Sequence, residues 1–172
     1  VDACVLIDLV RTKIGASVQT DRQKDAWYLQ KLLEANRDGE VEVFTSTLTV
    51  AECQYAGEKP LKDTTKAQLD LLLLSGQYVR LVQLTPFIAK DARDLRWTHG
   101  INLKGADSVH LASALAMGCT EFLSSDKRFQ RINDYKGALA KLGIEPRRCR
   151  DTALLPEKYL QENLPYDEGT KH

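Results

Sequence analysis

The chain has 172 residues, of which 43% are hydrophobic and 28% are charged, and its 24 basic side chains balance 24 acidic ones. This length fits a single globular domain with a substantial core. The formal net charge of zero excludes a protein that is held on nucleic acid mainly by an overall positive field, although it allows a local basic patch.

The apolar periodicity and the turn residues predict helices that alternate with strands. From the start of the chain we expect a buried strand over 1–7, a helix over 21–37, a strand over 41–46, a helix that begins at Thr47 or Thr49, and a helix over 62–75. There follow a strand over 78–84, a helix from Pro86 to about His99, a helix over 105–117, a strand over 119–125, a short helix that starts with Asp126, and a helix over 134–142.

This alternation predicts an α/β protein with a mainly parallel sheet. We expect one domain over 1–150. Residues 151–172 would be a C-terminal extension, packed on the same domain or partly disordered. The chain begins at Val1 without a methionine, so we expect a few residues to precede it and do not treat Asp2 as a frayed end.

Cysteine usage and hydropathy predict a cytoplasmic protein with no membrane partner. The four cysteines form no Cys-x-x-Cys pair and have no histidines at zinc-finger spacing, which is typical of a reduced intracellular protein. The longest wholly apolar run, 71–74, is far below the roughly 20 residues that span a bilayer. The N-terminus shows no secretory signal pattern.

Four acidic residues stand at the edges of apolar segments, namely Asp2, Glu52, Asp107 and Asp126. A carboxylate drawn into an apolar interior costs free energy unless it is paired, hydrogen-bonded or bound to a cation. Sites in parallel α/β sheets form beyond the carboxyl ends of the strands, and the predicted strands place Asp2 and Asp126 near such ends. Asp2 anchors the interpretation, since an acid inside an apolar strand has no cap or turn to serve.

Each of the other acids also has a local explanation. Glu52 matches a capping box that starts at Thr49. Asp107 fits the first turn of a helix, where it would complement the helix dipole. Asp126 fits an N-cap. Asp8 would cap the turn after the first strand, or would lie near the site.

The remaining polar candidates give weaker signals. His110 and His99 fit packed or surface histidines better than ligands. Ser124 and Ser125 precede Asp126 and could bond a carboxylate or a phosphate oxygen, or could be ordinary polar residues at a strand end.

If the four acids converge, their mutual repulsion would raise their pKa values and destabilise the fold unless divalent cations bound there. Ligands that are all oxygen select Mg²⁺ or Mn²⁺ over zinc. A bound water of lowered pKa could then act as a nucleophile.

In this order the segments resemble the PIN-domain nucleases, especially the VapC-like toxins of toxin–antitoxin pairs. The resemblance covers about 1–130. It rests on an acid followed by a hydrophobic run, a glutamate early in a helix, an aspartate that opens a small-residue helix, and a Ser-x-Asp after a strand, here DACVLI at 2–7, TVAE at 49–52, ADSVHLASA at 106–114 and SSD at 124–126.

The resemblance implies a three-layer α/β/α sandwich and a Mg²⁺- or Mn²⁺-dependent endoribonuclease that acts on single-stranded or structured RNA. It implies that Asp2 and Asp107 are the principal metal ligands, that Glu52 and Asp126 complete or orient the shell, and that Ser124 supports it by a hydrogen bond. It also implies a homodimer and a possible antitoxin partner. Cys4 stands where the family usually has Asn, Ser or Thr.

Substrate phosphates would need positive partners outside the acidic pocket. Any single basic residue fits a solvated surface, but as a group we expect an RNA-backbone track of Lys127, Arg128, Arg131, Arg93 and Arg96, with Arg147, Arg148 and Arg150 as a less certain addition. The apolar surplus over 67–74 suggests a second buried face, consistent with homodimerisation.

Two other functions compete with an endoribonuclease. One is a non-catalytic PIN-like module that binds RNA or a protein partner. The other is a different α/β phosphotransfer or hydrolase enzyme with acidic Mg²⁺ ligands, but the sequence shows no phosphate-binding glycine loop.

Overall fold

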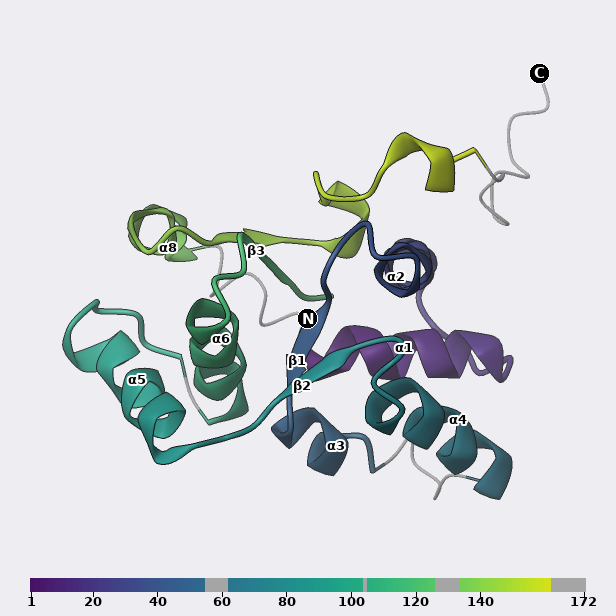
Figure 1. The fold of residues 1–172 in the computed structure, drawn as a ribbon, viewed down its shortest axis with the longest axis horizontal. Coiled ribbons are helices and arrows are strands. Elements are labelled where there is room, and N and C mark those ends of the chain that lie inside the picture. The colour runs from purple at the N-terminus through teal and green to yellow at the C-terminus, as the bar shows by residue number, and fades with distance from the viewer. Residues whose placement is uncertain (55–61, 104, 126–133, 162–172) are drawn as a thin grey trace.

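The computed structural model describes residues 1–54, 62–103, 105–125 and 134–161, in which helices alternate with short strands (Figure 1). The first half contains α1 (Ala3–Lys13), α2 (Thr20–Arg37), β1 (Phe44–Ser46), α3 (Leu48–Glu52), α4 (Asp63–Leu74) and β2 (Arg80–Val82). The second half contains α5 (Pro86–Trp97), α6 (Ala106–Ala116), β3 (Glu121–Leu123), α8 (Lys136–Lys141), β4 (Glu145–Arg147), and the 3₁₀ turns η1 (Cys149–Asp151) and η2 (Glu157–Tyr159).

The N-terminal apolar run is helical, so the prediction of a strand over 1–7 is wrong. Val5, Leu6, Leu9 and Val10 are all buried in α1, and their spacing places them on one helix face. A short apolar run cannot by its periodicity alone distinguish a buried strand from a buried helix. Asp2 keeps an extended backbone, with φ −74° and ψ 149°.

The other predicted elements that lie in the described part of the chain are present, and most are shorter than expected. Pro86 begins α5 as predicted, and the Thr85 hydroxyl accepts the backbone N–H of Ile88 as an N-cap. The strand β4 was not predicted, because its three residues Glu145–Arg147 contain no apolar alternation. The short helix expected from Asp126 lies outside the described residues.

The strands form two parallel pairs, β1 with β2 and β3 with β4. The first two residues of the chain connect these pairs. The Val1 backbone nitrogen donates to the Phe44 carbonyl at 2.6 Å, and the Asp2 N–H donates to the Leu123 carbonyl at 2.9 Å. The parallel strands and their helical connections confirm the predicted α/β fold class.

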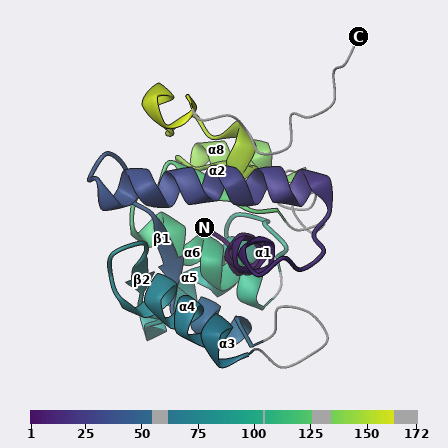
Figure 2. The same ribbon diagram turned by 90° about the vertical axis from the view of Figure 1, so that its right-hand side faces the viewer.

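Helices cover both faces of the strands (Figure 1). Adjacent residues of β3 point to opposite faces, as in any strand: Leu123 packs into a core cluster with α1, α2 and α4, whereas Phe122 packs with α5 and α6. Figure 2 shows α2 running the width of the molecule beside α1. The result is a layer of helices on each side of the strands.

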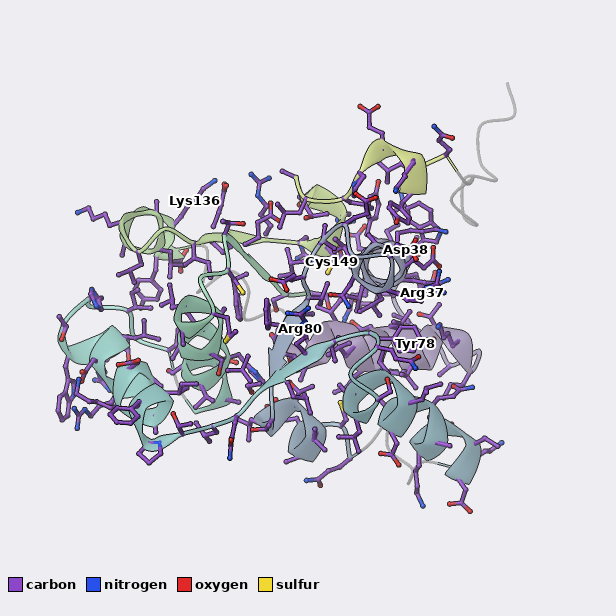
Figure 3. The ribbon with its side chains drawn as sticks, in the orientation of Figure 1. Arg37, Asp38, Tyr78, Arg80, Lys136 and Cys149 are labelled. Atoms are coloured by element: carbon purple, nitrogen blue, oxygen red, sulfur yellow. The ribbon has the colours of Figure 1, made fainter. Side chains whose placement is uncertain are left out.

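The segment after β4 returns to α2. Cys149 is fully buried in the core cluster that includes α2 (Figure 3). Farther along, the Tyr159 hydroxyl donates to Asp38 at 2.8 Å, and the Lys158 ammonium lies 2.6 Å from Glu40. Within the described residues, none of the helices combines the length and the apolar character needed to cross a bilayer.

Candidate active site

The carboxyl ends of the strands carry three of the four predicted acids. Asp2 bonds through its backbone to Leu123, the last residue of β3. Glu52 is the last residue of α3, which follows β1 almost directly. Asp107 is in the first turn of α6. Because α6 leads through a short turn into the start of β3, its own N-terminus lies at the opposite edge, where the strands end.

Asp2 occupies the N-cap position of α1, but its side chain forms no capping hydrogen bond. Its Oδ2 instead accepts a hydrogen bond from the Ser124 hydroxyl at 2.8 Å, and only 8% of the residue is exposed. The sequence argument that Asp2 had no helix end to occupy was therefore wrong. The carboxylate nevertheless turns away from its own helix and toward the end of β3.

Cys4 supplies a second polar contact to Asp2, with its Sγ 3.3 Å from Oδ2. Burial, followed by the Asp2 charge, raises the pKa of the Cys4 thiol to about 12. The thiol therefore stays protonated near neutral pH and acts as a weak donor. Cys4 thus keeps a polar contact at a position where the resembled family usually has a hydroxyl or an amide.

Glu52 does not form the capping box that its spacing suggested. The helix begins two residues earlier than this capping box requires, at Leu48, and its N-cap Thr47 makes no side-chain cap. The Thr49 hydroxyl lies 2.6 Å from that of Thr45. Glu52 Oε2 instead lies 2.7 Å from His110 Nε2.

His110, which the sequence analysis treated as a packed or surface histidine, contacts two elements of this candidate site. It is only 3% exposed, and its Nδ1 lies 3.0 Å from the Ser46 hydroxyl at the end of β1. The sequence signal was its spacing of three residues from Asp107, which places both side chains on one face of α6.

Asp107 is the second residue of α6, whose N-cap is Gly105. The φ of +50° and ψ of −122° at Gly105 lie in a region that favours glycine. The side chain is 8% exposed, and a negative charge in the first turn is stabilised by the helix dipole. The contact between His110 and Ser46 holds this part of α6 against the end of β1, so Asp107 lies one turn beyond that end.

A metal ion fits this donor set by its chemistry. Carboxylates with neighbouring hydroxyl groups suit hard cations such as Mg²⁺ and Mn²⁺. Within 1–54, 62–103, 105–125 and 134–161, however, no three His, Cys, Asp or Glu side chains are grouped closely enough to hold an ion. The fourth predicted acid, Asp126, lies outside these ranges.

A further acid, Asp8, lies beside this edge and is fully buried in α1. It does not cap a turn as expected. Its Oδ2 accepts hydrogen bonds from Arg22 Nε at 2.7 Å and from the Ser125 hydroxyl at 2.9 Å. Asp8 therefore connects α1, the start of α2 and the segment that follows β3.

Arg93 and Arg96 lie toward the far end of α5. This helix begins just after β2, so Arg93 is seven residues beyond Pro86, roughly 10 Å along the axis. The guanidinium of Arg93 stacks on Trp97, with 4.4 Å from Cζ to the ring centroid, and pairs with Asp94 at 3.0 Å. The other predicted RNA-backbone residues, Lys127, Arg128 and Arg131, lie outside the described residues.

The basic run after β4 pairs with carboxylates of this same chain. Arg148 lies 3.3 Å from the buried Asp25, and Arg150 lies 2.9 Å from Asp21. Arg147 pairs with Glu121 and Glu145, and also donates to the Asp151 carbonyl. These contacts give the run a structural role in attaching the chain after β4 to α2 and β3.

The fold and this edge define a class: an α/β protein in which carboxylates from separate elements lie at the ends of parallel strands. The PIN domain family profile matches residues 1–135, most of the chain, so the protein belongs to the PIN-domain family. Comparisons with curated proteins and with solved structures gave no significant match. The PIN domain is a nuclease-type fold, and a hydrolase acting on nucleic acid is the corresponding enzyme class.

Proposed function

We propose that this protein is an endoribonuclease that uses Mg²⁺ or Mn²⁺ to hydrolyse phosphodiester bonds in single-stranded RNA. The observation that supports the proposal is that Asp2, Glu52 and Asp107 each stand next to the carboxyl end of a strand in a PIN domain. These acids come from three separate segments: the residue before α1, the end of α3 and the first turn of α6. Two of them, Asp2 and Asp107, are almost fully buried.

Each residue has a distinct part in the proposed reaction. Asp2 and Asp107 would hold the ion, while Glu52 and Asp126 would complete or orient its ligand shell. When bound, the ion supplies the Lewis acidity that lowers the pKa of an attacking water and stabilises charge on the phosphate. Ser124 keeps the Asp2 carboxylate turned toward the end of β3 through its 2.8 Å hydrogen bond.

We further propose that this protein is the toxin of a toxin–antitoxin pair and that it forms a homodimer. Leu71 and Leu74 of α4 are 53% and 56% exposed. A pocket of about 290 Å³ lies beside them between α1, α2 and α4, lined in part by Leu9 and Leu33. An exposed apolar face of this kind supports a protein partner.

Metal withdrawal tests the catalytic proposal. We expect the purified protein to cleave a 5′-labelled unstructured RNA with Mg²⁺ or Mn²⁺, to lose at least about 100-fold in rate with excess chelator, and to recover when the ion is restored. Product ladders on denaturing gels measure the rate. A DNA strand of the same sequence tests the preference for RNA.

Chelator that is already saturated with Mg²⁺ controls for effects of the chelator itself. Cleavage that persists without free metal would contradict the proposal. Specific RNA binding without any cleavage would favour the non-catalytic module. Rapid cleavage in vitro without growth arrest on expression in bacteria would reject the toxin role and leave the nuclease in place.

A further inference from the structure

His110 connects three elements of the candidate site. Its ring lies between the Ser46 hydroxyl at the end of β1, 3.0 Å from Nδ1, and Glu52 Oε2 at the end of α3, 2.7 Å from Nε2. The His110 side chain is 2% exposed, whereas that of Glu52 is 31% exposed. A buried ring thus holds one oxygen of a carboxylate that reaches the surface.

Two simpler roles do not fit this geometry. Ser46, His110 and Glu52 include the residue types of a hydrolytic triad, but Ser46 is only 1% exposed, and a nucleophile must reach its substrate. His110 is also a poor candidate for a metal ligand, because both of its ring nitrogens already face protein partners.

The short helix α3 explains why Glu52 needs support. It has only five residues, and no side-chain cap fixes its start. The Thr45–Thr49 contact anchors its middle, but Glu52 is at its last residue, and a long acidic side chain there has several rotamers to sample.

We propose that His110 is a positioning residue, which orients the Glu52 carboxylate toward the proposed metal site at the carboxyl ends of the strands. This inference rests on the proposed function, in which Glu52 belongs to the metal site. In this arrangement the ring donates its Nε2–H to Glu52 Oε2, and Nδ1 accepts a hydrogen bond from the Ser46 hydroxyl. One Glu52 oxygen is then held, which sets the direction of the other. Outer partners of this kind change metal affinity or activity by about 10- to 100-fold when they are removed.

The ring geometry provides two matched substitutions. Glutamine carries an amide near the place of Nε2, and asparagine carries one near the place of Nδ1. His110→Gln can still donate to Glu52, whereas His110→Asn retains a polar group only toward Ser46. His99 is an exposed histidine in the turn after α5, so His99→Asn is the control for the residue type.

We expect His110→Asn to lower kcat by about 10- to 100-fold and to raise the Mn²⁺ concentration for half-activation, with little change in KM for RNA. His110→Gln should stay within about tenfold of wild type, as a partial replacement of the donor. If His110 had a purely structural role, both variants would lose activity in parallel with a fall in their thermal unfolding midpoints. Equal activity and equal Mn²⁺ dependence in wild type and both variants would overturn the inference.

A measurement without metal or substrate separates this inference from the proposed function. The ¹⁵N chemical shifts of the His110 ring should show a protonated Nε2 and an unprotonated Nδ1, and Glu52→Gln should shift the Nε2 signal more than the Nδ1 signal. A ring protonated only on Nδ1 would overturn the inference, even if the variants at His110 do not fold. If the wild-type protein does not cleave RNA, the proposed function is rejected. The ring spectrum and the Mn²⁺ affinity would then still decide whether His110 orients Glu52.

Discussion

Replacing Asp107 by asparagine is expected to reduce metal-dependent RNA cleavage by at least about 100-fold while the protein stays folded. The two side chains have nearly the same shape, so the first turn of α6 can accept the change. What is lost is the negative charge that would hold the ion. Only 8% of Asp107 is exposed, so little water is present to replace the missing ligand. Rates at saturating Mn²⁺, together with circular dichroism, measure the effect.

Asp63 provides the matched control for Asp107. It is also in the first turn of a helix, α4, but its side chain is 98% exposed and pairs with Lys66. Asp63→Asn removes the same favourable charge at a helix N-terminus, about 0.3–1 kcal/mol, and should leave cleavage unchanged. An Asp107→Asn variant that cleaves at the wild-type rate would remove Asp107 from the site, and Asp2→Asn provides the parallel test of the second proposed ligand.

Replacing Arg22 by methionine is expected to lower the free energy of unfolding by about 3 kcal/mol at pH 7.5, the lower end for breaking a buried ion pair because Arg22 is partly exposed. Asp8 is fully buried, whereas the Arg22 side chain is 31% exposed. Without the guanidinium, Asp8 keeps only the Ser125 hydroxyl as a donor on Oδ2. Its Oδ1 is buried and has no hydrogen-bond partner among the described residues. The variant therefore leaves Asp8 inside the protein with the Ser125 hydrogen bond and the charge of Arg11 as its remaining compensation.

The cost of losing Arg22 should depend on pH. Burial raises the pKa of Asp8 above its ordinary value, while the Ser125 hydrogen bond and the Arg22 charge oppose that shift. When a carboxyl group has a higher pKa in the folded state than in the unfolded state, its contribution to stability is greatest below the unfolded-state pKa, near 3.8. That contribution is lost as the pH rises through the folded-state pKa. Removing Arg22 raises the pKa further, so the destabilisation should be larger at pH 7.5 than at pH 5.

Urea unfolding at both pH values measures this difference. Arg37→Met is the control, because Arg37 is also on α2 but pairs with Asp38 at an exposed position, where an ion pair contributes at most about 1 kcal/mol. Asp8→Asn removes the buried charge and should reduce the penalty of Arg22→Met in the double variant. A pH-independent loss, or one no larger than that of Arg37→Met, would show that the Asp8–Arg22 pair does not carry this stability.

Much of the fold could be predicted from local patterns, because a helix or strand leaves its period in the apolar residues. Pro86 and the stripe that includes Ile88 and Leu95 place α5 correctly. The wrong prediction of a strand over 1–7 arose because the apolar run there is short. DACVLID has too few residues to show a helical period, and only the continuation through Leu9 and Val10 places the buried face on a helix.

The sequence could predict which acids belong to the candidate site, but not which side chains those acids contact. Local rules gave each acid an isolated meaning: a capping box for Glu52, a dipole charge for Asp107, a turn cap for Asp8. The structure replaces the first with a contact to His110, 58 residues away, and the third with a pair to Arg22. No local pattern carries such information, because the partners approach only when helices pack across the strands.

The sequence by itself determined the alternation of helices and strands, the α/β class, and the order of acids that matches the PIN-domain family. Periodicity and motif spacing act over a few residues, so they can be read before any packing is known. Only the tertiary structure decided that Asp2 turns toward Ser124, that the basic run after β4 pairs with the protein's own carboxylates, and that a buried histidine holds Glu52. The physical reason is that a carboxylate's role depends on what surrounds it, and those surroundings come from segments distant in the chain.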